Sequence, residues 1–433
     1  MPLTKLSLGG SAFGGVFTPM SDDQCLTILR RAFNAGMSLI DTAPWYQASE
    51  RVLGRCLRKL AAEVPRDRYQ LNTKVGRYPT GKMFDFSAAR VARSVEDSLA
   101  ALQVDYIDTI QVHDCEFGDE DVIVNETLPL LDELRRAGKV RRIGITGYEL
   151  GTLRRIIERS SVRIDAVLSY CRYTLNDRAL VERVAVPEQS QSQSQSQSRS
   201  PSAAAGEANV DDGAGEDFVS FLERHNIQLI NASAIAMGLL CNKEPPAWHP
   251  ASDDLKQRCV AASAYAEAHG CNLARLALGF VLRHPRIPTT LVSVTNMDFM
   301  EANLDVMQNG LTAAEQGVLD EVLARFFPTS ENWEGVEKGR MRGKKKEAGV
   351  AKAEERKNAA EEKVGDVTDS NNKVNDGKVP SDDKVGHTGG GGDDDGAKKH
   401  LSVPEEAEEK GDDDARESEA KEPEPTERAV LVD

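Results

Sequence analysis

Short apolar runs rich in Val, Ile and Leu alternate with longer amphipathic segments along the first three quarters of the chain. Such runs are typical of buried strands when turn residues bound them. Eight strands are predicted in this way, at residues 5–10, 37–42, 69–74, 107–113, 141–146, 165–170, 227–233 and 289–294.

The segments between these runs show helical patterns. Residues 21–36 begin with Ser21 as an N-cap and end at Gly36, a residue that commonly follows a helix. Residues 87–103 start with Ser87 in the same role, and their Val and Leu residues share one face. Further helices are predicted at 126–139, 254–270 and 273–284.

Alternation of strand and helix predicts a parallel sheet, and eight units favour a closed (β/α)8 barrel, the TIM barrel. The alternative is an open doubly wound sheet that binds a dinucleotide at a GxGxxG turn. The early glycines in "LGGSAFGGVF" lack that spacing, and no helix follows them directly.

Composition separates two segments from this pattern. Residues 338–433 contain no Phe, Trp or Tyr, and residues 187–217 are dominated by Ser, Gln, Ala, Gly and acidic residues. Neither can bury enough apolar surface to offset the entropy of ordering, so both are predicted to be disordered. The prediction is one barrel over 1–337, interrupted by a loop insertion at 187–217 and followed by a tail.

The charge is acidic overall, with a net value of −16, of which residues 338–433 contribute −7 through 26 acidic and 19 basic side chains. No basic face emerges, so nucleic acid is not expected as a partner of the barrel. The basic run "KGRMRGKKK" at 338–346 is interpreted as a solvated start of the tail, with an import signal or anionic-surface patch as the alternative.

Seven cysteines without paired spacing favour reduced thiols and offer no metal site. The N-terminus does not resemble a signal peptide, and no run of 18 apolar residues occurs. A cytoplasmic protein with no membrane association is the resulting expectation.

Ionisable side chains stand at the ends of three consecutive predicted strands: Asp41, Lys74 and His113. In a barrel of this type these ends meet at one rim, where catalytic sites lie. Each residue alone has an ordinary explanation as a turn cap, a surface lysine or a rim histidine. Together they would be costly unless they compensate one another, and Tyr46 follows Asp41 closely enough to join them.

These four residue types suit proton transfer. An ammonium beside a phenol favours the phenolate and prepares Tyr46 to act as a general acid or base. Asp41 would hold Lys74 charged and oriented, and His113 would position a substrate oxygen. The arrangement predicts proton transfer to or from an alcohol or carbonyl oxygen.

The sequence resembles the aldo-keto reductases. The resemblance rests on "DTAPWY", "LNTK" and "IQVHD", which carry Asp41, Tyr46, Lys74 and His113 in the order of that family's tetrad, and on "GKVRRIGITG" and "INASAIAMGLL". It implies a (β/α)8 enzyme that binds NAD or NADP without a dinucleotide-binding sheet and transfers hydride to or from a carbonyl or alcohol carbon. Tyr46 would be the proton carrier.

Within the family, "SYCRYTLNDRAL" and "PPAWHPAS" look most like the group of L-galactose dehydrogenase and fungal NAD-dependent D-arabinose 1-dehydrogenase. The resemblance implies oxidation of the anomeric hydroxyl of an aldose to a lactone, as in ascorbate or erythroascorbate pathways. The alternatives are an NADPH-dependent aldehyde or ketone reductase, and a cofactor-binding regulatory scaffold whose tail recruits partners.

The resemblance also assigns a cofactor site, with departures from the family pattern. Thr146 and Gly147 replace the usual Ser-Asn after the fifth strand, and Ser169 and Tyr170 stand where a Gln is usual. The segment after the eighth strand has no base for a 2′-phosphate, which favours NAD over NADP. The remaining predicted cofactor residues, which also suit ordinary turns and caps, are Ser233, Ser293, Thr295, Asn296 and Asn303.

Two tryptophans are candidates for the substrate pocket. Trp45 beside Tyr46 is expected to form a wall that faces the sugar, whereas Trp333 fits core packing equally well.

Overall fold

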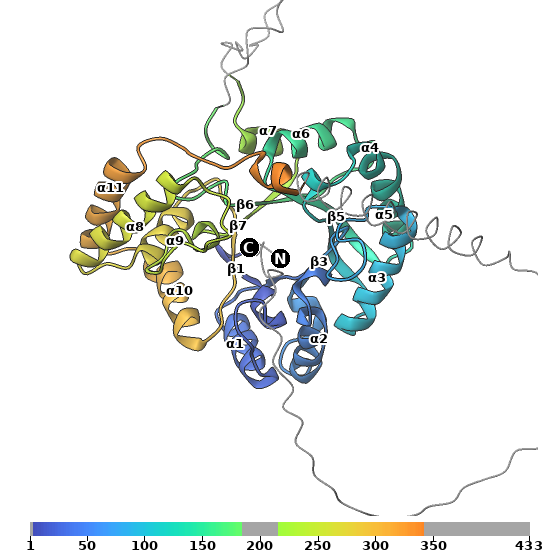
Figure 1. The fold of residues 1–433 in the computed structure, drawn as a ribbon. Coiled ribbons are helices and arrows are strands. Elements are labelled where there is room, and N and C mark those ends of the chain that lie inside the picture. The colour runs from blue at the N-terminus through green and yellow to red at the C-terminus, as the bar shows by residue number, and fades with distance from the viewer. Residues whose placement is uncertain (1–2, 184–214, 342–433) are drawn as a thin grey trace, which may run out of the picture. The chain divides into compact units, whose positions relative to one another are not determined.

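The computed structural model describes residues 3–183 and 215–341. Eight parallel strands close into a barrel in chain order, with β8 hydrogen-bonded to β1 (Figure 1). This confirms the predicted (β/α)8 barrel and rules out the open doubly wound sheet. The strands are β1 (Leu6–Gly9), β2 (Leu39–Asp41), β3 (Gln70–Val75), β4 (Ile107–Val112), β5 (Val140–Gly147), β6 (Ala166–Tyr170), β7 (Gln228–Ala232) and β8 (Thr290–Val292).

Helices surround the barrel on its outer side (Figure 1). The loops at its rim contain single 3-10 turns, of which η2 (Pro44–Tyr46) and η4 (Cys115–Phe117) bear on the site. The helices are α1 (Asp22–Asn34), α2 (Ser49–Leu60), α3 (Ala88–Leu102), α4 (Glu120–Val122), α5 (Leu128–Arg136), α6 (Leu150–Arg159), α7 (Phe218–Arg224), α8 (Asp253–Ala268), α9 (Leu273–Leu282), α10 (Met297–Asn309) and α11 (Ala313–Phe326). None of these is long and apolar enough to cross a membrane.

The helix signals in the sequence have local physical causes. Ser21 accepts a hydrogen bond from the backbone of Gln24, whose side chain binds back to Ser21, so α1 begins with a capping box. Gly36 follows α1 with a φ of +83°, a left-handed conformation that favours glycine. Ser87 precedes α3 as predicted, but its side chain makes no capping hydrogen bond.

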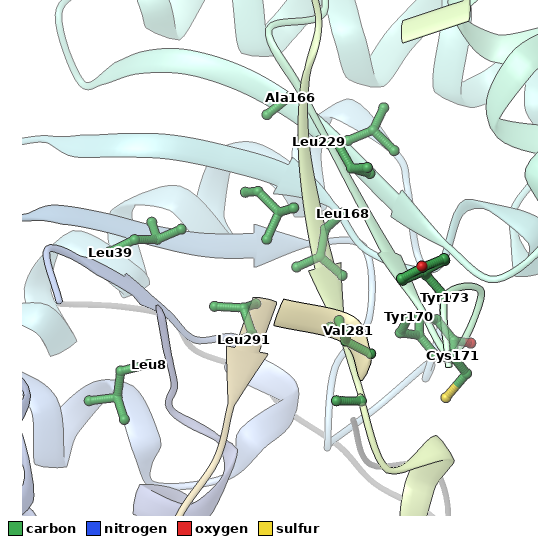
Figure 2. Packing of buried hydrophobic residues seen from close by; sticks show 14 of the residues in the cluster. Leu8, Leu39, Ala166, Leu168, Tyr170, Cys171, Tyr173, Leu229, Val281 and Leu291 are labelled. Atoms are coloured by element: carbon green, nitrogen blue, oxygen red, sulfur yellow. The ribbon is translucent and has the colours of Figure 1, made fainter. Parts of the chain in front are cut away.

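Strand alternation divides the apolar residues between two layers. Leu39, Leu168 and Leu291 point toward one another inside the barrel, whereas Leu8 and Leu229 point outward toward the helices (Figure 2). All five side chains are buried. The strands therefore read as nearly continuous apolar runs, because both of their faces are covered.

The register of the strands places the polar residues of β2, β3 and β4 side by side. Asp41 pairs with Asn72, and Lys74 pairs with Gln111, so residues of one parity face the barrel interior. Lys74 and Asp41 are joined by an ion pair inside the barrel. Gln111 and His113 have the same parity, so His113 follows on the same side of β4.

Most of the two low-complexity segments predicted as disordered lies outside the described residues. At their edges, Asp217 caps α7 and pairs with Arg286 at 3.0 Å, although the sequence assigned it to the insertion. Lys338 pairs with Glu149 at 2.6 Å, although it was assigned to the tail. The structure thus places residues 215–217 and 338–341 with the barrel.

The last described residues, 331–341, form a segment that we call the C-terminal strap. Trp333 donates its backbone N–H to the hydroxyl of Tyr148 at 2.9 Å and stacks on that ring at 5.0 Å between centroids. Glu334 pairs with Arg172 at 2.9 Å. These contacts fix the strap to the loops that follow β5 and β6.

Candidate functional site

Lys74 lies at the centre of the predicted tetrad. Its ammonium group forms an ion pair with Asp41 Oδ1, donates to the carbonyl of Thr42 at 3.0 Å and donates to the hydroxyl of Tyr46 at 3.2 Å. The lysine residue is 1% exposed, so these three acceptors replace water around a buried charge. The structure thereby brings three of the four predicted residues into direct contact.

Asp41 is equally buried and has a second partner that the sequence interpretation missed. Burial raises the pKa of this carboxyl, while the charge of Lys74 and hydrogen bonds from Lys74 and Gln111 lower it. Gln111 Nε2 donates to Asp41 Oδ2 at 2.6 Å. Both carboxylate oxygens are therefore engaged, which holds the orientation of Asp41 toward Lys74. Gln111 stands two residues before His113, so the alternation of β4 was a signal for it.

Tyr46 reaches the site through the short turn η2, which follows β2 and begins with Pro44. Proline fits the first position of a helical turn because its φ is already helical. The Lys74 ammonium lies 4.7 Å from the centre of the Tyr46 ring. The ring of His113 meets the Tyr46 ring edge-on, with centroids 5.9 Å apart and an interplanar angle of 87°.

His113 completes the group at the end of β4. Its backbone N–H donates to the carbonyl of Val75, at 2.9 Å, so the strand ladder continues to this residue. Burial and the cations Lys74 and Arg77 hold the pKa of His113 well below its usual range. The imidazole is therefore neutral at physiological pH. Its Nδ1 has no hydrogen-bond partner among the residues that the structure describes.

An ion pair stands next to the tetrad, and neither of its members was predicted. Arg77 Nη1 donates to Asp114 Oδ2 at 2.6 Å, and the same oxygen is 3.7 Å from His113 Nε2. The Arg77 guanidinium also lies over the ring of Trp45, 4.1 Å from its centre. Trp45, which was predicted to face the sugar, is therefore held by Arg77, the ion-pair partner of Asp114.

Two further buried carboxyl groups, Glu116 and Glu337, lie near Asp114 of this ion pair. Burial and the charge of Asp114 raise the pKa of Glu116 to about 8, and the same two causes raise the pKa of Glu337 to about 7. Burial also raises the pKa of Asp114, against the effect of Arg77. Nothing in the sequence pattern indicated this cluster, because Glu337 comes from the strap. No group of His, Cys, Asp or Glu suited to holding a metal ion occurs within the described residues.

The residues predicted for the nicotinamide end lie on β5 and β6. Thr146 Oγ1 accepts the backbone N–H of Asp114 at 3.0 Å. A side chain at Gly147 would collide with Glu116 Oε2, and the Tyr170 hydroxyl donates to Glu116 Oε1 at 3.4 Å. These three predicted residues thus contact the acidic cluster.

Ser169 differs from those neighbours. It pairs in register with Gly147 and Asn231, and its Oγ is buried without a hydrogen-bond partner among the described residues. Asn231 Oδ1 is also buried without a hydrogen-bond partner among the described residues. Both side chains have the parity of Leu229, so they face the surrounding helices and not the barrel interior (Figure 2).

The residues predicted for the phosphate and adenine end follow β7 and β8. Ser233 begins a turn in which it, Ala236 and Met237 adopt left-handed φ values between 50° and 59°. Strained backbone of this kind concentrates at binding sites. The predicted residues after β8 comprise Ser293, which bonds to Ser11 Oγ at 2.7 Å, Asn296, which caps α10, and the half-buried Thr295 and Asn303.

Trp333 packs into the strap and is 3% exposed. It stacks on Tyr148 and meets the ring of His249 edge-on, with centroids 4.7 Å apart. Of the two alternatives that the sequence left open, the structure therefore favours core packing for Trp333.

Comparisons with known proteins agree with this geometry. A profile of the Aldo/keto reductase family matches residues 5–185 and 201–324. L-galactose dehydrogenase of Arabidopsis thaliana is 35% identical over 332 residues, which cover 76% of this chain and 92% of the relative. D-arabinose 1-dehydrogenase of Saccharomyces cerevisiae is 29% identical over 353 residues, 76% of this chain and 93% of the relative.

A solved structure shows the same fold. The glycerol dehydrogenase from Gluconobacter oxydans superposes with a TM-score of 0.55 at 24% identity, covering 77% of this chain and 95% of that one. The barrel, the grouped side chains and the profile match point to one conclusion: the chain belongs to the aldo/keto reductase family.

Proposed function

We propose that the protein is an NAD-dependent dehydrogenase that oxidises the anomeric hydroxyl of an aldose, of the D-arabinose or L-galactose type, to the lactone. The observation that carries the proposal is Lys74, whose ammonium group binds both Asp41 and the hydroxyl of Tyr46. The two sugar dehydrogenases described above support the substrate class, since nearly their whole length is matched.

Tyr46 would accept the proton of the anomeric hydroxyl as the carbon is oxidised. The adjacent Lys74 stabilises negative charge on the phenol oxygen, and Asp41 orients Lys74 through an ion pair. In the direction of reduction the same phenol would return the proton to the carbonyl oxygen. The chemistry therefore requires no residue outside the four predicted ones and Gln111.

His113 would position the reacting oxygen. Because burial and two nearby cations keep it neutral, it offers one N–H donor and brings no additional positive charge. Its ring already contacts the ring of Tyr46. A hydroxyl held between these two side chains lies within reach of both.

Members of this family use nicotinamide cofactors, and the residues present fit one. Thr146 and Tyr170, which have the inward parity of Lys74 and Gln111, would face its nicotinamide end. The nicotinamide, when bound, supplies the hydride acceptor or donor, and the protein supplies orientation and proton handling.

NAD is the proposed cofactor because the adenosine end lacks a cation for a 2′-phosphate. The first turn of α10 contains Asp298 and no base. Arg31, which reaches α10 from α1, is engaged by both carboxylate oxygens of Glu301 at 2.6 and 2.9 Å. A 2′-phosphate at this helix would therefore meet a carboxylate without a free arginine.

All seven cysteines are unpaired, which supports a reducing compartment such as the cytoplasm. A regulatory scaffold with a partner-recruiting tail stays a prediction, because residues 342–433 lie outside the described part of the chain.

The decisive experiment compares initial rates of two reactions. D-arabinose, L-galactose and L-fucose would be oxidised with NAD or NADP, and simple aldehydes would be reduced with NADH or NADPH. We expect aldose oxidation with NAD to have the highest kcat/KM. Efficient aldehyde reduction with NADPH and no aldose oxidation would instead establish the reductase alternative.

A further inference from the structure

Arg77 and Asp114 stand just after β3 and β4, close to Lys74 and His113. Arg77 stands three residues after Lys74, and Asp114 follows His113 directly. Their side chains are only 5% and 3% exposed. A buried ion pair loses so much hydration that it contributes little to stability, so its presence at the rim calls for another reason.

The donors of Arg77 are incompletely used. Nη1 binds Asp114, but the buried Nε and Nη2 have no hydrogen-bond partner within the described part of the chain. Leaving donors of a charged group unsatisfied is costly. Arg66, in a structural ion pair with Asp108 at 2.6 Å, shows the contrast: it also donates to the carbonyls of Tyr69 and Tyr106 and leaves only Nε unpartnered.

Both members of the pair are held firmly in place. The Arg77 backbone forms an antiparallel bridge with Phe84, and its guanidinium lies over the rings of Trp45 and Phe84 at 4.1 and 5.4 Å. Asp114 has a left-handed φ of +50°, and its N–H donates to Thr146 Oγ1 at 3.0 Å. Such preorganisation is expected of a group that orients a ligand.

We propose that Arg77 and Asp114 form a hydroxyl-binding subsite that selects polyhydroxylated substrates, a role that rests on the proposed sugar dehydrogenase function. Arg77 donates to one hydroxyl oxygen of the sugar, and Asp114 accepts from a neighbouring hydroxyl. Because Asp114 lies 3.7 Å from His113 Nε2, these are hydroxyls close to the reacting carbon.

The charges around the pair favour a neutral ligand. Asp114 already compensates the charge of Arg77, and the carboxyl groups of Glu116 and Glu337 stand near Asp114. A substrate carboxylate would add negative charge to this group of acids. The subsite therefore suits an aldose better than a sugar acid.

The test uses two three-carbon aldehydes that differ only in their hydroxyl groups, D-glyceraldehyde and propanal. Their reduction is measured in the wild type, Arg77→Gln and Asp114→Asn, with cofactor in excess. We expect the ratio of kcat/KM for glyceraldehyde to that for propanal to fall about tenfold to hundredfold in both variants. The ratio is the readout and not the absolute rate, because Arg77 and Asp114 also border His113 and Trp45 and their loss lowers both rates to some extent.

Arg66→Gln is the matched control, because it removes an arginine from another ion pair near the same strands. Its substrate ratio should equal that of the wild type. If Arg77→Gln fails to fold, Arg77→Lys retains the charge without the planar fork and should still lower the ratio. An unchanged ratio in the folded variants, or an equal fall for both aldehydes, would overturn the subsite.

Aldose oxidation by the wild type separates this proposal from the function on which it rests. If the wild type oxidises aldoses but the substrate ratio does not change in the variants, the function stands and the subsite is wrong. If the wild type oxidises no aldose and the ratio still falls, the subsite stands for another polyhydroxylated substrate and the proposed reaction is wrong.

Discussion

Two neighbouring regions of the barrel rim handle buried charge in opposite ways. At the ends of β2 to β4, the single carboxylate of Asp41 is matched by Lys74 and fixed by Gln111. Beyond β4, Glu116 and Glu337 take part in none of the ion pairs between described residues, and burial raises the pKa of both. Burial also raises the pKa of Asp41, but Lys74 and Gln111 oppose that shift, whereas no ion pair between described residues opposes it at Glu116 or Glu337.

This difference shows what each region does well. An ammonium group that is held by Asp41 can stabilise a phenolate at Tyr46, which suits proton transfer there. Acids without a cation exchange protons near pH 7 to 8, so the second region responds to pH. We suggest that the first region carries catalysis and the second carries the pH response. Substitutions in each region separately test this division.

The largest effect is expected from Tyr46→Phe. The change removes the proton carrier but keeps the ring that packs against His113, so kcat should fall about 10²- to 10⁴-fold while cofactor binding persists. Steady-state rates and fluorescence titration with NADH would measure the two quantities. Tyr69→Phe is the control, because Tyr69 precedes β3 at the end of that strand away from Lys74. Turnover at the wild-type rate would refute the role of Tyr46.

A smaller loss is expected from Gln111→Met, which keeps the volume of the side chain but removes the donor to Asp41. A hydrogen bond to a charged group is worth about 1.5–3 kcal/mol. If that bond maintains the charge and orientation of Asp41, kcat should fall about tenfold to hundredfold. Gln228→Met removes an acceptor for Arg142 at the other end of the barrel and should leave kcat unchanged. Equal kcat values in both folded variants would contradict the positioning role.

Glu116→Gln tests the second region through the pH dependence of stability. The pKa of Glu116 is raised to about 8 in the folded state, so its stabilising contribution is complete below about pH 4.5 and is lost as pH rises through 8. The free energy of unfolding of the wild type should therefore decrease across this window. The variant should show a decrease smaller by at least about 2 kcal/mol, because each pKa unit corresponds to about 1.4 kcal/mol.

Urea unfolding at a series of pH values would measure this slope. Glutamine can still accept the N–H that Tyr148 donates to Glu116, at 2.8 Å in the wild type, so the local geometry should be retained. Identical slopes in the two proteins would show that Glu116 does not hold the extra proton.

The first region could be predicted from the sequence because its residues end successive strands. Apolar runs located β2, β3 and β4, and the parallel topology then brought Asp41, Lys74 and His113 to one rim. Gln111 was overlooked, although alternation along β4 places it on the side of His113. Arg77 also follows its strand closely, but one charged residue in a loop is not distinctive without its partner.

The second region could not be predicted, because its contacts depend on how distant segments return to the barrel. Glu337 comes from the strap, more than 200 residues after Glu116. Trp333 shows the same limitation: only its stacking on Tyr148 decides between a core role and a substrate role. The cofactor residues on β6 were inferred from family resemblance and not from periodicity, since Ser169 alone carries no chemical signature.

Ser169→Ala is expected to have the smallest effect and sharpens the comparison on the cofactor side. Because the buried Oγ has no partner among the described residues, its removal should leave the melting temperature unchanged or slightly higher. If the hydroxyl binds the carboxamide, KM for NAD should rise about two- to tenfold at constant kcat. Ser7→Ala is the matched control: Ser7 Oγ bonds to Thr289 Oγ1 at 2.6 Å, so this variant should melt earlier and keep its KM. A lower melting temperature without a change in KM in Ser169→Ala would show that Ser169 is a packing residue and does not bind the cofactor.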